Sequence, residues 1–315
     1  MNLDAIQQAA QRLSGIAHRT PLLHSRLLDE HCGGRIYLKA ENLQRSGAFK
    51  VRGAYNALAT NLEAARRAGV ITASSGNHGG ALALAAQILG VKAIVVMPID
   101  APAVKEAAIR AYGAEVVKIG TTSEERLSHA GERARRDGLV EIPPYDHPDV
   151  IAGQGTCALE IHEEVRADYL LACCGGGGLL AGTCLATAGV APWCSVMGVE
   201  TEAANDTWQS FARRERVRIE LPDTLADGMR NLSPGKLTFP INLAHAKGIA
   251  LVSEQGLIDA MKFLFSRMKI VVEPTGAAPI AALMSRQIDL QGKTAVAILS
   301  GGNVDAALYA KLITS

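Results

Sequence analysis

The chain has 315 residues, and its 32 lysines and arginines against 31 aspartates and glutamates leave a formal charge of only +1. This balance argues against a broad electrostatic surface for nucleic acid or for an anionic membrane. Hydrophobic residues make up 48% and charged residues 20%, which excludes bulk disorder and predicts one large domain or two smaller ones.

Short apolar runs alternate with longer amphipathic ones along the chain. In chain order, the expected strands are residues 70–73, 93–97, 115–119, 139–142, 169–174, 195–200 and 295–299. The expected helices are residues 78–89, 104–112, 124–136, 155–165, 179–188, 257–268 and 277–286. Strand, helix and strand at this spacing favour right-handed βαβ units on parallel sheets.

Two stretches mark crossings between lobes. One contains Pro143 and Pro144 and continues to Gly155, and the other lies near Asn61. We therefore expect a large domain of residues 1–60 and 147–315, with a small domain of residues 61–146 inserted in it.

The sequence favours a soluble, cytoplasmic protein. The N-terminus lacks the apolar segment of a signal peptide, and no run of 18 apolar residues occurs. The six cysteines are too sparse for a disulfide scaffold or a zinc site, and Cys173 and Cys174 lie in an apolar run that predicts buried, reduced thiols. The basic run of residues 213–218 includes an acidic residue and no aromatic one, which predicts a solvated face.

Four consecutive glycines, Gly175 to Gly178, follow an expected strand and open an expected helix. Their backbone N–H groups suit a bound phosphate because no side chains stand in the way, although a flexible turn is the simpler alternative. The segment contains neither GxxxxGK[ST] nor a convincing GxGxxG with an acidic residue about 20 positions later. The phosphate is therefore not expected to belong to a nucleotide.

Three other segments are candidates for ligand binding. Residues 74–80 and 300–303 follow expected strands, at the edge where open α/β sheets bind ligands. The first of these could bind a carboxylate or only cap a helix. Lys50, between Phe49 and Val51, is either a Schiff-base nucleophile in apolar surroundings or an ordinary exposed lysine.

Taken in order, these segments resemble the fold type II family of pyridoxal-phosphate enzymes, in the branch of serine/threonine dehydratases and serine racemases. The resemblance runs from His18-Arg19-Thr20-Pro21-Leu22 to Ser300-Gly301-Gly302-Asn303. It includes Ser46-Gly47-Ala48-Phe49-Lys50, where Ala48 replaces the more usual Ser or Thr. It implies an α/β fold of two lobes, similar to the β-subunit of tryptophan synthase, with open, mostly parallel twisted sheets and helices on both faces.

The resemblance also implies site residues. Lys50 would form a Schiff base with pyridoxal 5'-phosphate and then take the α-proton of the substrate, and Ser75 would be a second catalytic residue on the opposite face of the α-carbon. The expected cofactor-binding residues are Phe49, Lys50, Asn77, Gly175, Gly176, Gly177, Gly178, Leu179 and Ser300. The expected substrate-binding residues are Ser74, Ser75, Gly76, His78 and Arg126.

The implied reaction is β-elimination. Ser300 would face the pyridine nitrogen, and its neutral hydroxyl makes the ring a weaker electron sink than a carboxylate would, which favours elimination over a long-lived carbanion. The expected activity is that of an ammonia-lyase, or dehydratase, acting on L-threonine and L-serine. Serine racemase, 3-hydroxyaspartate ammonia-lyase and a non-catalytic binder are the alternatives. Ser75 and Arg126 suit the racemase, and Tyr145 suits the dehydratase.

The remaining expectations concern metal, regulation and assembly. Glu200, Ala204 and Asp206 match the spacing with which this branch binds a divalent cation, so Mg²⁺ or Ca²⁺ is expected there; an acidic strand end at the surface is the alternative. The chain ends at Ser315, soon after the last expected strand, so no effector domain and no inhibition by isoleucine are expected. The expected partners are a small amino-acid substrate and further copies of the chain, as a homodimer or a dimer of dimers, without nucleic acid or membrane.

Overall fold

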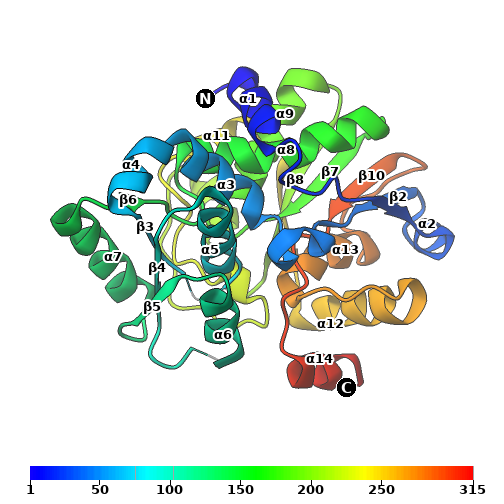
Figure 1. The fold of residues 1–315 in the computed structure, drawn as a ribbon. Coiled ribbons are helices and arrows are strands. Elements are labelled where there is room, and N and C mark those ends of the chain that lie inside the picture. Colours follow the sequence, from blue (N-terminus) through cyan, green and yellow to red (C-terminus); the bar gives the residue numbers. More distant parts are fainter. Residues whose placement is uncertain (75, 102, 315) are drawn as a thin grey trace.

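The structure, a computed structural model, describes residues 1–74, 76–101 and 103–314, which form an α/β fold with two sheets (Figure 1). The six-stranded sheet has the order β1 (Leu22–His24), β2 (Arg35–Lys39), β10 (Thr294–Ile298), β7 (Tyr169–Cys173), β8 (Ser195–Thr201) and β9 (Gly248–Val252). The four-stranded sheet has the order β5 (Glu115–Lys118), β4 (Ala93–Met97), β3 (Val70–Ala73) and β6 (Val140–Glu141). All neighbouring strands are parallel except β1 and β2. The predicted fold class is confirmed.

Helices flank both sheets. The α-helices are α1 (Leu3–Leu13), α2 (Arg26–Cys32), α3 (Lys50–Thr60), α4 (Leu62–Ala68), α5 (Asn77–Leu89), α6 (Ala103–Ala111), α7 (Ser123–Asp137), α8 (Pro148–Glu164), α9 (Gly178–Val190), α10 (Asp206–Arg213), α11 (Thr238–His245), α12 (Glu254–Phe263), α13 (Pro274–Met284) and α14 (Ala306–Thr314). Short 3₁₀ turns are η1 (Glu41–Leu43), η2 (Arg45–Gly47) and η3 (Asp227–Met229), and η4 (Leu264–Met268) is a π-helical turn.

Each sheet has its own hydrophobic core. The larger core surrounds the six-stranded sheet, whose central strands β7 and β10 are buried on both faces, as is usual for parallel strands covered by helices. The second core lies against the four-stranded sheet and includes Val51 and Leu58 of α3 together with Leu82 of α5. Helix α3 also packs against α8, so it contacts elements of both lobes. The boundaries at residues 60–61 and 146–147 stay a prediction.

Several element boundaries differ from the predicted ones. Helix α8 begins at Pro148 and not at residue 155, because the His147 side chain accepts a hydrogen bond from the Asp149 backbone N–H and Pro148 occupies the first helical position. Helix α12 ends at Phe263 and passes into η4 before residue 268. The three-residue strand β1 lies below the length at which an apolar pattern predicts a strand.

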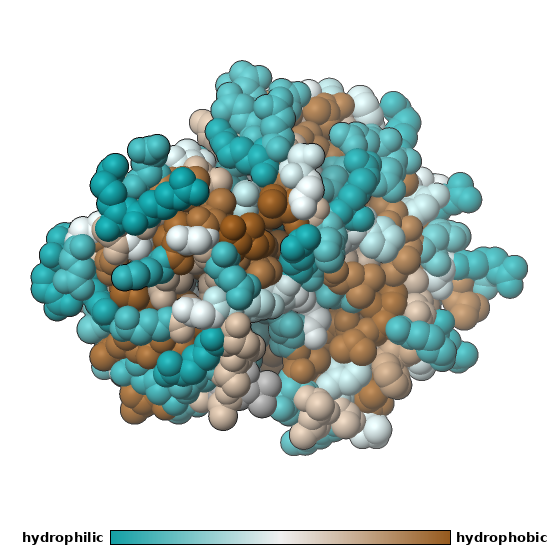
Figure 2. Space-filling model, in the orientation of Figure 1, coloured by the Kyte–Doolittle hydropathy of each residue, from teal (hydrophilic) through white to brown (hydrophobic). Residues whose placement is uncertain are grey.

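The surface is mixed in polarity. Figure 2 shows hydrophilic side chains over much of one face, with hydrophobic ones gathered in smaller areas between them. Among the described residues, no helix is long and apolar enough to cross a membrane. All six cysteines are free and buried, which confirms the prediction made for Cys173 and Cys174.

Candidate active site

The candidate residues gather where parallel strands end. Strands β2, β10 and β7 are neighbours, and the segments that follow them contain Lys50, Ser300 and Gly175, respectively. Backbone hydrogen bonds join the first two segments, from Phe49 N to Ser300 O (3.0 Å) and from Gly302 N to Gly47 O (2.9 Å). The lysine and serine segments are therefore held together by their main chains, at the edge where open α/β sheets place their ligands.

Lys50 is the first residue of α3 and its side chain is half-buried. The amine Nζ donates a hydrogen bond to Pro144 O (2.7 Å) and lies 5.1 Å from the centroid of the buried Phe49 ring. Loss of hydration lowers the pKa of Lys50 from 10.5 to about 8, although nearby Cys173 and Glu273 act in the opposite direction. About a tenth of this amine is therefore unprotonated at pH 7, and about half at pH 8, and this fraction is able to act as a base or nucleophile.

The glycine loop is held by residues distant in the sequence. Gly177 has φ of +88°, and a Cβ there would lie 2.6 Å from Asn242 Nδ2. Thr238 Oγ1 donates to Gly176 O (2.7 Å), and Asn242 Nδ2 donates to Gly177 O (3.3 Å). The described side chains provide no cap for the start of α9, so its first N–H groups remain suited to an anion. Leu179 is buried in the larger core.

Thr238 and Asn242 were missed by the sequence reasoning. They lie on α11, which contains no recognisable motif, and about 60 residues separate them from the glycine loop. Asp146, next to the Tyr145 that the sequence pattern had singled out, accepts hydrogen bonds from the N–H groups of Leu237 and Thr238 near the start of α11. The signal that could have found this contact is Gly235, just before α11, where a Cβ would meet Asp146 Oδ1 and lie 2.6 Å from Thr238 Oγ1.

A phosphorylated pyridine ring fits the residues present. The Ser300 side chain is completely buried, and its Oγ has no hydrogen-bond partner with normal geometry among the described residues. Burial raises the pKa of the neighbouring Cys173 thiol to about 11, and the nearby Ser300 hydroxyl makes this rise smaller. A buried hydroxyl without a partner is costly unless a ligand atom satisfies it. Pyridoxal phosphate needs an amine, a phosphate site and a contact for its ring nitrogen. Lys50, the uncapped start of α9 and the Ser300 hydroxyl match these three needs in that order.

The start of α5 lies at the carboxyl end of β3. Ser74 Oγ accepts a hydrogen bond from Gly76 N (3.3 Å), and no side chain of the described residues caps the helix at Gly76. His78 is buried, and its Nε2 contacts Ile142 O (3.0 Å), so this nitrogen carries a hydrogen and donates it. Burial and the charge of Lys50 lower the pKa of His78 to about 3, so the ring is neutral. Negative charge is favoured here by the helix N-terminus and not by the imidazole.

Asn77 of α5 contacts the other lobe through its side-chain amide. Its Nδ2 donates to Glu273 Oε1 (2.7 Å), and its Oδ1 accepts from Asn303 Nδ2 (2.8 Å). The neighbouring Ser75, expected to be catalytic and substrate-binding, lies outside the described residues.

Arg126 lies in the first turn of α7 and is largely buried. Its guanidinium donates to Thr121 O (3.1 Å) and is influenced by the charge of Asp100, which follows the carboxyl end of β4. Arg126 is therefore near the edge of the four-stranded sheet from which α5 begins. The described contacts do not connect it to Lys50.

Glu200 and Asp206 form a buried carboxylate pair beside Ala204, all at the carboxyl end of β8. Glu200 accepts hydrogen bonds from Thr207 N (3.0 Å) and Trp208 N (2.8 Å), whereas both oxygens of Asp206 lack partners within the described part of the chain. Burial raises the pKa of both groups, that of Asp206 from 3.8 to about 7, and Asp206 further raises that of Glu200. Among the described residues no three acidic, histidine or cysteine side chains cluster, so a cation here would need backbone oxygens or water as further ligands.

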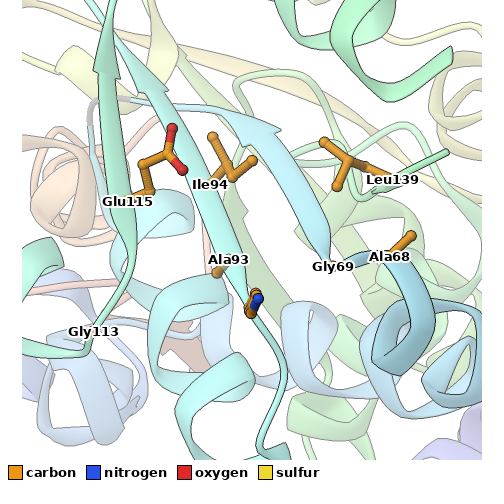
Figure 3. Close-up of a pocket in the computed structure, with 8 residues that line it drawn as sticks. Ala68, Gly69, Ala93, Ile94, Gly113, Glu115 and Leu139 are labelled. Carbon is orange, nitrogen blue, oxygen red and sulfur yellow. The ribbon is translucent and has the colours of Figure 1, made fainter. Parts of the chain in front are cut away.

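A separate hollow of about 210 Å³ lies at the opposite edge of the four-stranded sheet (Figure 3). Gly69, Ala93 and Glu115, which line it, stand at the amino-terminal ends of β3, β4 and β5. Its only charged lining residues are Lys92 and Glu115. Since ligands of open α/β sheets bind at the carboxyl ends of the strands, this hollow is not the candidate active site.

The chain is similar to known proteins over almost its full length. Residues 13–301 match the family described as "Pyridoxal-phosphate dependent enzyme". The chain is 46% identical to the serine racemase of Schizosaccharomyces pombe, covering 99% of this chain and 97% of that relative. It is 47% identical to the L-threo-3-hydroxyaspartate ammonia-lyase of Pseudomonas sp, covering 97% and 96%. The crystal structure of a threonine deaminase from T.th. superposes with a TM-score of 0.91 at 47% identity, covering 97% and 99%.

Proposed function

The chain belongs to the family of pyridoxal-phosphate dependent enzymes, and on this basis we propose that it is an ammonia-lyase that converts L-threonine and L-serine to 2-oxo acids and ammonia. The observation that carries the proposal is the pair formed by Lys50, whose pKa falls to about 8, and the neutral, buried Ser300 on the adjoining segment. An unprotonated amine supplies the base, and a neutral hydroxyl at the ring favours elimination. When bound, the cofactor supplies an electron-withdrawing ring that stabilises negative charge at the α-carbon of the substrate.

The residues of this chain bind the substrate and the phosphate, take the α-proton and exclude water. The uncapped N-terminus of α5 binds the substrate carboxylate, because its first N–H groups carry partial positive charge. Lys50 takes the α-proton at Nζ, and the hydrogen bond to Pro144 O orients that nitrogen. The glycine loop holds the phosphate through backbone N–H groups, with Thr238 and Asn242 fixing two of its carbonyl groups. Phe49 and Leu179 keep water away from the reacting atoms with buried apolar surface.

L-threo-3-hydroxyaspartate is the second candidate substrate. The ammonia-lyase of Pseudomonas sp that bears this name is 47% identical to the chain, and the yeast enzyme of the same name is 46% identical. Such a substrate carries a second carboxylate, for which Arg126 is the cation we propose. Racemisation of serine depends on a group on the other face of the α-carbon, for which Ser75 is the candidate.

A substrate comparison tests the proposed activity. The protein loaded with pyridoxal phosphate is incubated separately with L-threonine, L-serine and L-threo-3-hydroxyaspartate, and 2-oxo acid, ammonia and D-serine are quantified. We expect 2-oxobutyrate from threonine with the highest kcat/KM, and pyruvate from serine. If the protein formed oxaloacetate from L-threo-3-hydroxyaspartate and left threonine unchanged, the second candidate substrate would be the correct one. D-serine as the main product from L-serine would identify a racemase.

We extend the proposal to a divalent cation, Mg²⁺ or Ca²⁺, held by Glu200, Asp206 and the Ala204 carbonyl. Two buried carboxylates, one with both oxygens unpaired, form a site of hard oxygen ligands, and these carboxyl groups need a nearby positive charge to be ionised.

The cytoplasmic location of the protein stays a prediction. Its assembly as a homodimer or a dimer of dimers also stays a prediction, and light scattering on the purified protein tests it.

The metal site predicts a pH-dependent stability. Both carboxyl pKa values are raised in the folded protein, so folding binds protons that the unfolded chain releases. Without metal, the stability that these bound protons contribute is present at low pH, and the part due to Asp206 is lost as the pH rises from about 4 to about 7. We expect the melting temperature of protein treated with EDTA to fall on the order of 5 °C between pH 5 and pH 8, and Mg²⁺ or Ca²⁺ to restore it.

Asp206→Asn is the matched variant for that measurement. It removes one titrating oxygen while keeping the shape of the side chain, so both the pH-dependent loss and the response to metal are expected to shrink. Equal melting temperatures at pH 8 with and without metal, in the unsubstituted protein, would rule out a cation at this pair.

A further inference from the structure

Glu273 is a buried acid that the proposed reaction does not yet use. It immediately precedes α13, with its side chain 4% exposed, and its N–H donates to Gly301 O (3.1 Å). The main chain of Glu273 is thereby attached to the segment after β10 that also contains Ser300. An acid buried to this extent needs partners for its oxygens.

The Glu273 carboxyl group contacts the other lobe through Asn77. Its Oε1 accepts from Asn77 Nδ2 (2.7 Å), while Asn303 Nδ2 donates to Asn77 Oδ1 (2.8 Å) and to Ser46 O (2.7 Å). Both ends of the Asn77 amide are thus occupied by groups of opposite hydrogen-bonding character. Rotating the amide by half a turn would set the Asn77 NH₂ against the Asn303 NH₂ and lose that bond, and the contact with Glu273 would survive only if the carboxyl group changed from acceptor to donor.

Gly301 leaves the space in which these side chains meet. A Cβ at this position would lie 2.5 Å from Glu273 Oε1 and 3.1 Å from Asn77 Nδ2. The absence of a side chain after β10 therefore allows the starts of α5 and α13 to approach each other. Three segments of the candidate site converge on this one contact.

The charges around Glu273 come from several elements. Burial, with a smaller effect of Asp227 of η3, raises its pKa from 4.5 to about 8, although the Asn77 hydrogen bond, Lys105 of α6 and Lys50 of α3 act in the opposite direction. Lys105 itself pairs with Asp227 (3.0 Å) across the lobes. The Glu273 carboxyl group is therefore mostly neutral at pH 7 and becomes an anion above about pH 8.

We propose that Glu273 is a positioning residue of the cofactor site, which fixes the side-chain amide of Asn77 in one orientation across the two lobes. The proposal rests on the cofactor site proposed above, because the fixed amide matters only if a ligand ring contacts it. A neutral acceptor is suited to this task, since the cofactor is itself an anion and an ionised Glu273 would repel it.

The test measures cofactor affinity, separately from catalysis. The dissociation constant of pyridoxal phosphate is determined by absorbance titration of the cofactor-free protein and of Glu273→Ala, Glu273→Gln and the exposed control Glu63→Ala. We expect Glu273→Ala to weaken binding on the order of 10-fold at pH 7. Glu273→Gln and the control are expected to remain within about 3-fold, because a carboxamide oxygen still accepts the Asn77 N–H.

The pH profile separates a positioning role from a merely structural one. Between pH 7 and pH 9.5 the unsubstituted protein is expected to lose affinity relative to Glu273→Gln, which cannot ionise; both retain Lys50, so its titration is common to the two. The proposal would be overturned if Glu273→Ala bound pyridoxal phosphate as tightly as the unsubstituted protein and had the same melting temperature. If that variant does not fold, parallel pH profiles of the unsubstituted protein and Glu273→Gln would overturn it instead. Failure of the unsubstituted protein to bind the cofactor would refute the proposed function itself.

Discussion

Replacing Lys50 with alanine is expected to abolish ammonia-lyase turnover, with a loss of at least about 10³-fold in kcat. The variant removes the amine that takes the α-proton and also the expected point of covalent attachment for the cofactor. Among the described lysines near the site, none can replace it: Lys39 is paired with Glu160 (2.7 Å) and Lys105 with Asp227 (3.0 Å). The measurement is 2-oxo acid formation from L-threonine and L-serine.

A second readout makes this prediction specific to the site. Borohydride reduction of the loaded protein followed by peptide mass spectrometry is expected to find the cofactor on Lys50, and to find none on the Lys50→Ala variant. Lys311→Ala, which removes an exposed lysine of α14, is the control and is expected to retain full activity and labelling. Retained turnover in Lys50→Ala would refute the site assignment.

The sequence predicted the strands best where they are buried on both faces. Strand β4 has the predicted bounds, residues 93–97, because a β-branched run closed by a proline has few alternatives. The segments that carry Gly175 and Ser300 were found because each follows such a strand. Lys50 was found from its apolar neighbours and from the family resemblance, since the strand before it, β2, was not predicted. The expected roles of these residues stay predictions, but their proximity follows from the parallel order of β2, β10 and β7.

Contacts between distant segments could not be predicted from spacing. Thr238 and Asn242 support the glycine loop from a short helix with no motif, and Glu273 meets Asn77 across 196 residues of chain. Their residue types are common on exposed surfaces as well, so only the three-dimensional structure identifies them as partners. The same is true of Arg52, for which the sequence pattern indicated no role.

Arg52 is the centre of a buried cluster of charges at the start of α3. Its guanidinium donates to Glu41 Oε1 and Oε2 (both 2.8 Å) and to Glu160 Oε1 (2.6 Å), and Lys39 Nζ pairs with Glu160 (2.7 Å). The side chains of Arg52, Glu41 and Lys39 are essentially inaccessible to solvent. Burial alone would raise the pKa of Glu41, but Arg52, with help from Thr20 and Lys39, outweighs that effect and holds the pKa below 4.5. Glu41 is therefore an anion that depends on Arg52.

Arg52→Met is expected to destabilise the protein by about 3–5 kcal/mol, because it leaves the Glu41 carboxylate buried without its main partner. The effect of the lost charge follows from the sign of the pKa shift. With its pKa lowered in the folded state, Glu41 contributes stability above its unfolded pKa, and that contribution is lost as the pH falls. The urea midpoint of the variant should therefore lie far below that of the unsubstituted protein at pH 7, and the gap should narrow toward pH 4.

Arg26→Met provides the matched control, since it removes an arginine of a different ion pair by the same substitution. Arg26 pairs with Glu30 at 3.6 Å with both side chains mainly exposed, so its loss is expected to change stability by less than about 0.5 kcal/mol. A loss below about 1 kcal/mol in Arg52→Met would contradict the prediction and imply that Glu41 becomes protonated or hydrated at little cost. Because Arg52 is two residues after Lys50 on α3, a large loss would also connect the stability of this helix start to the position of the proposed catalytic amine.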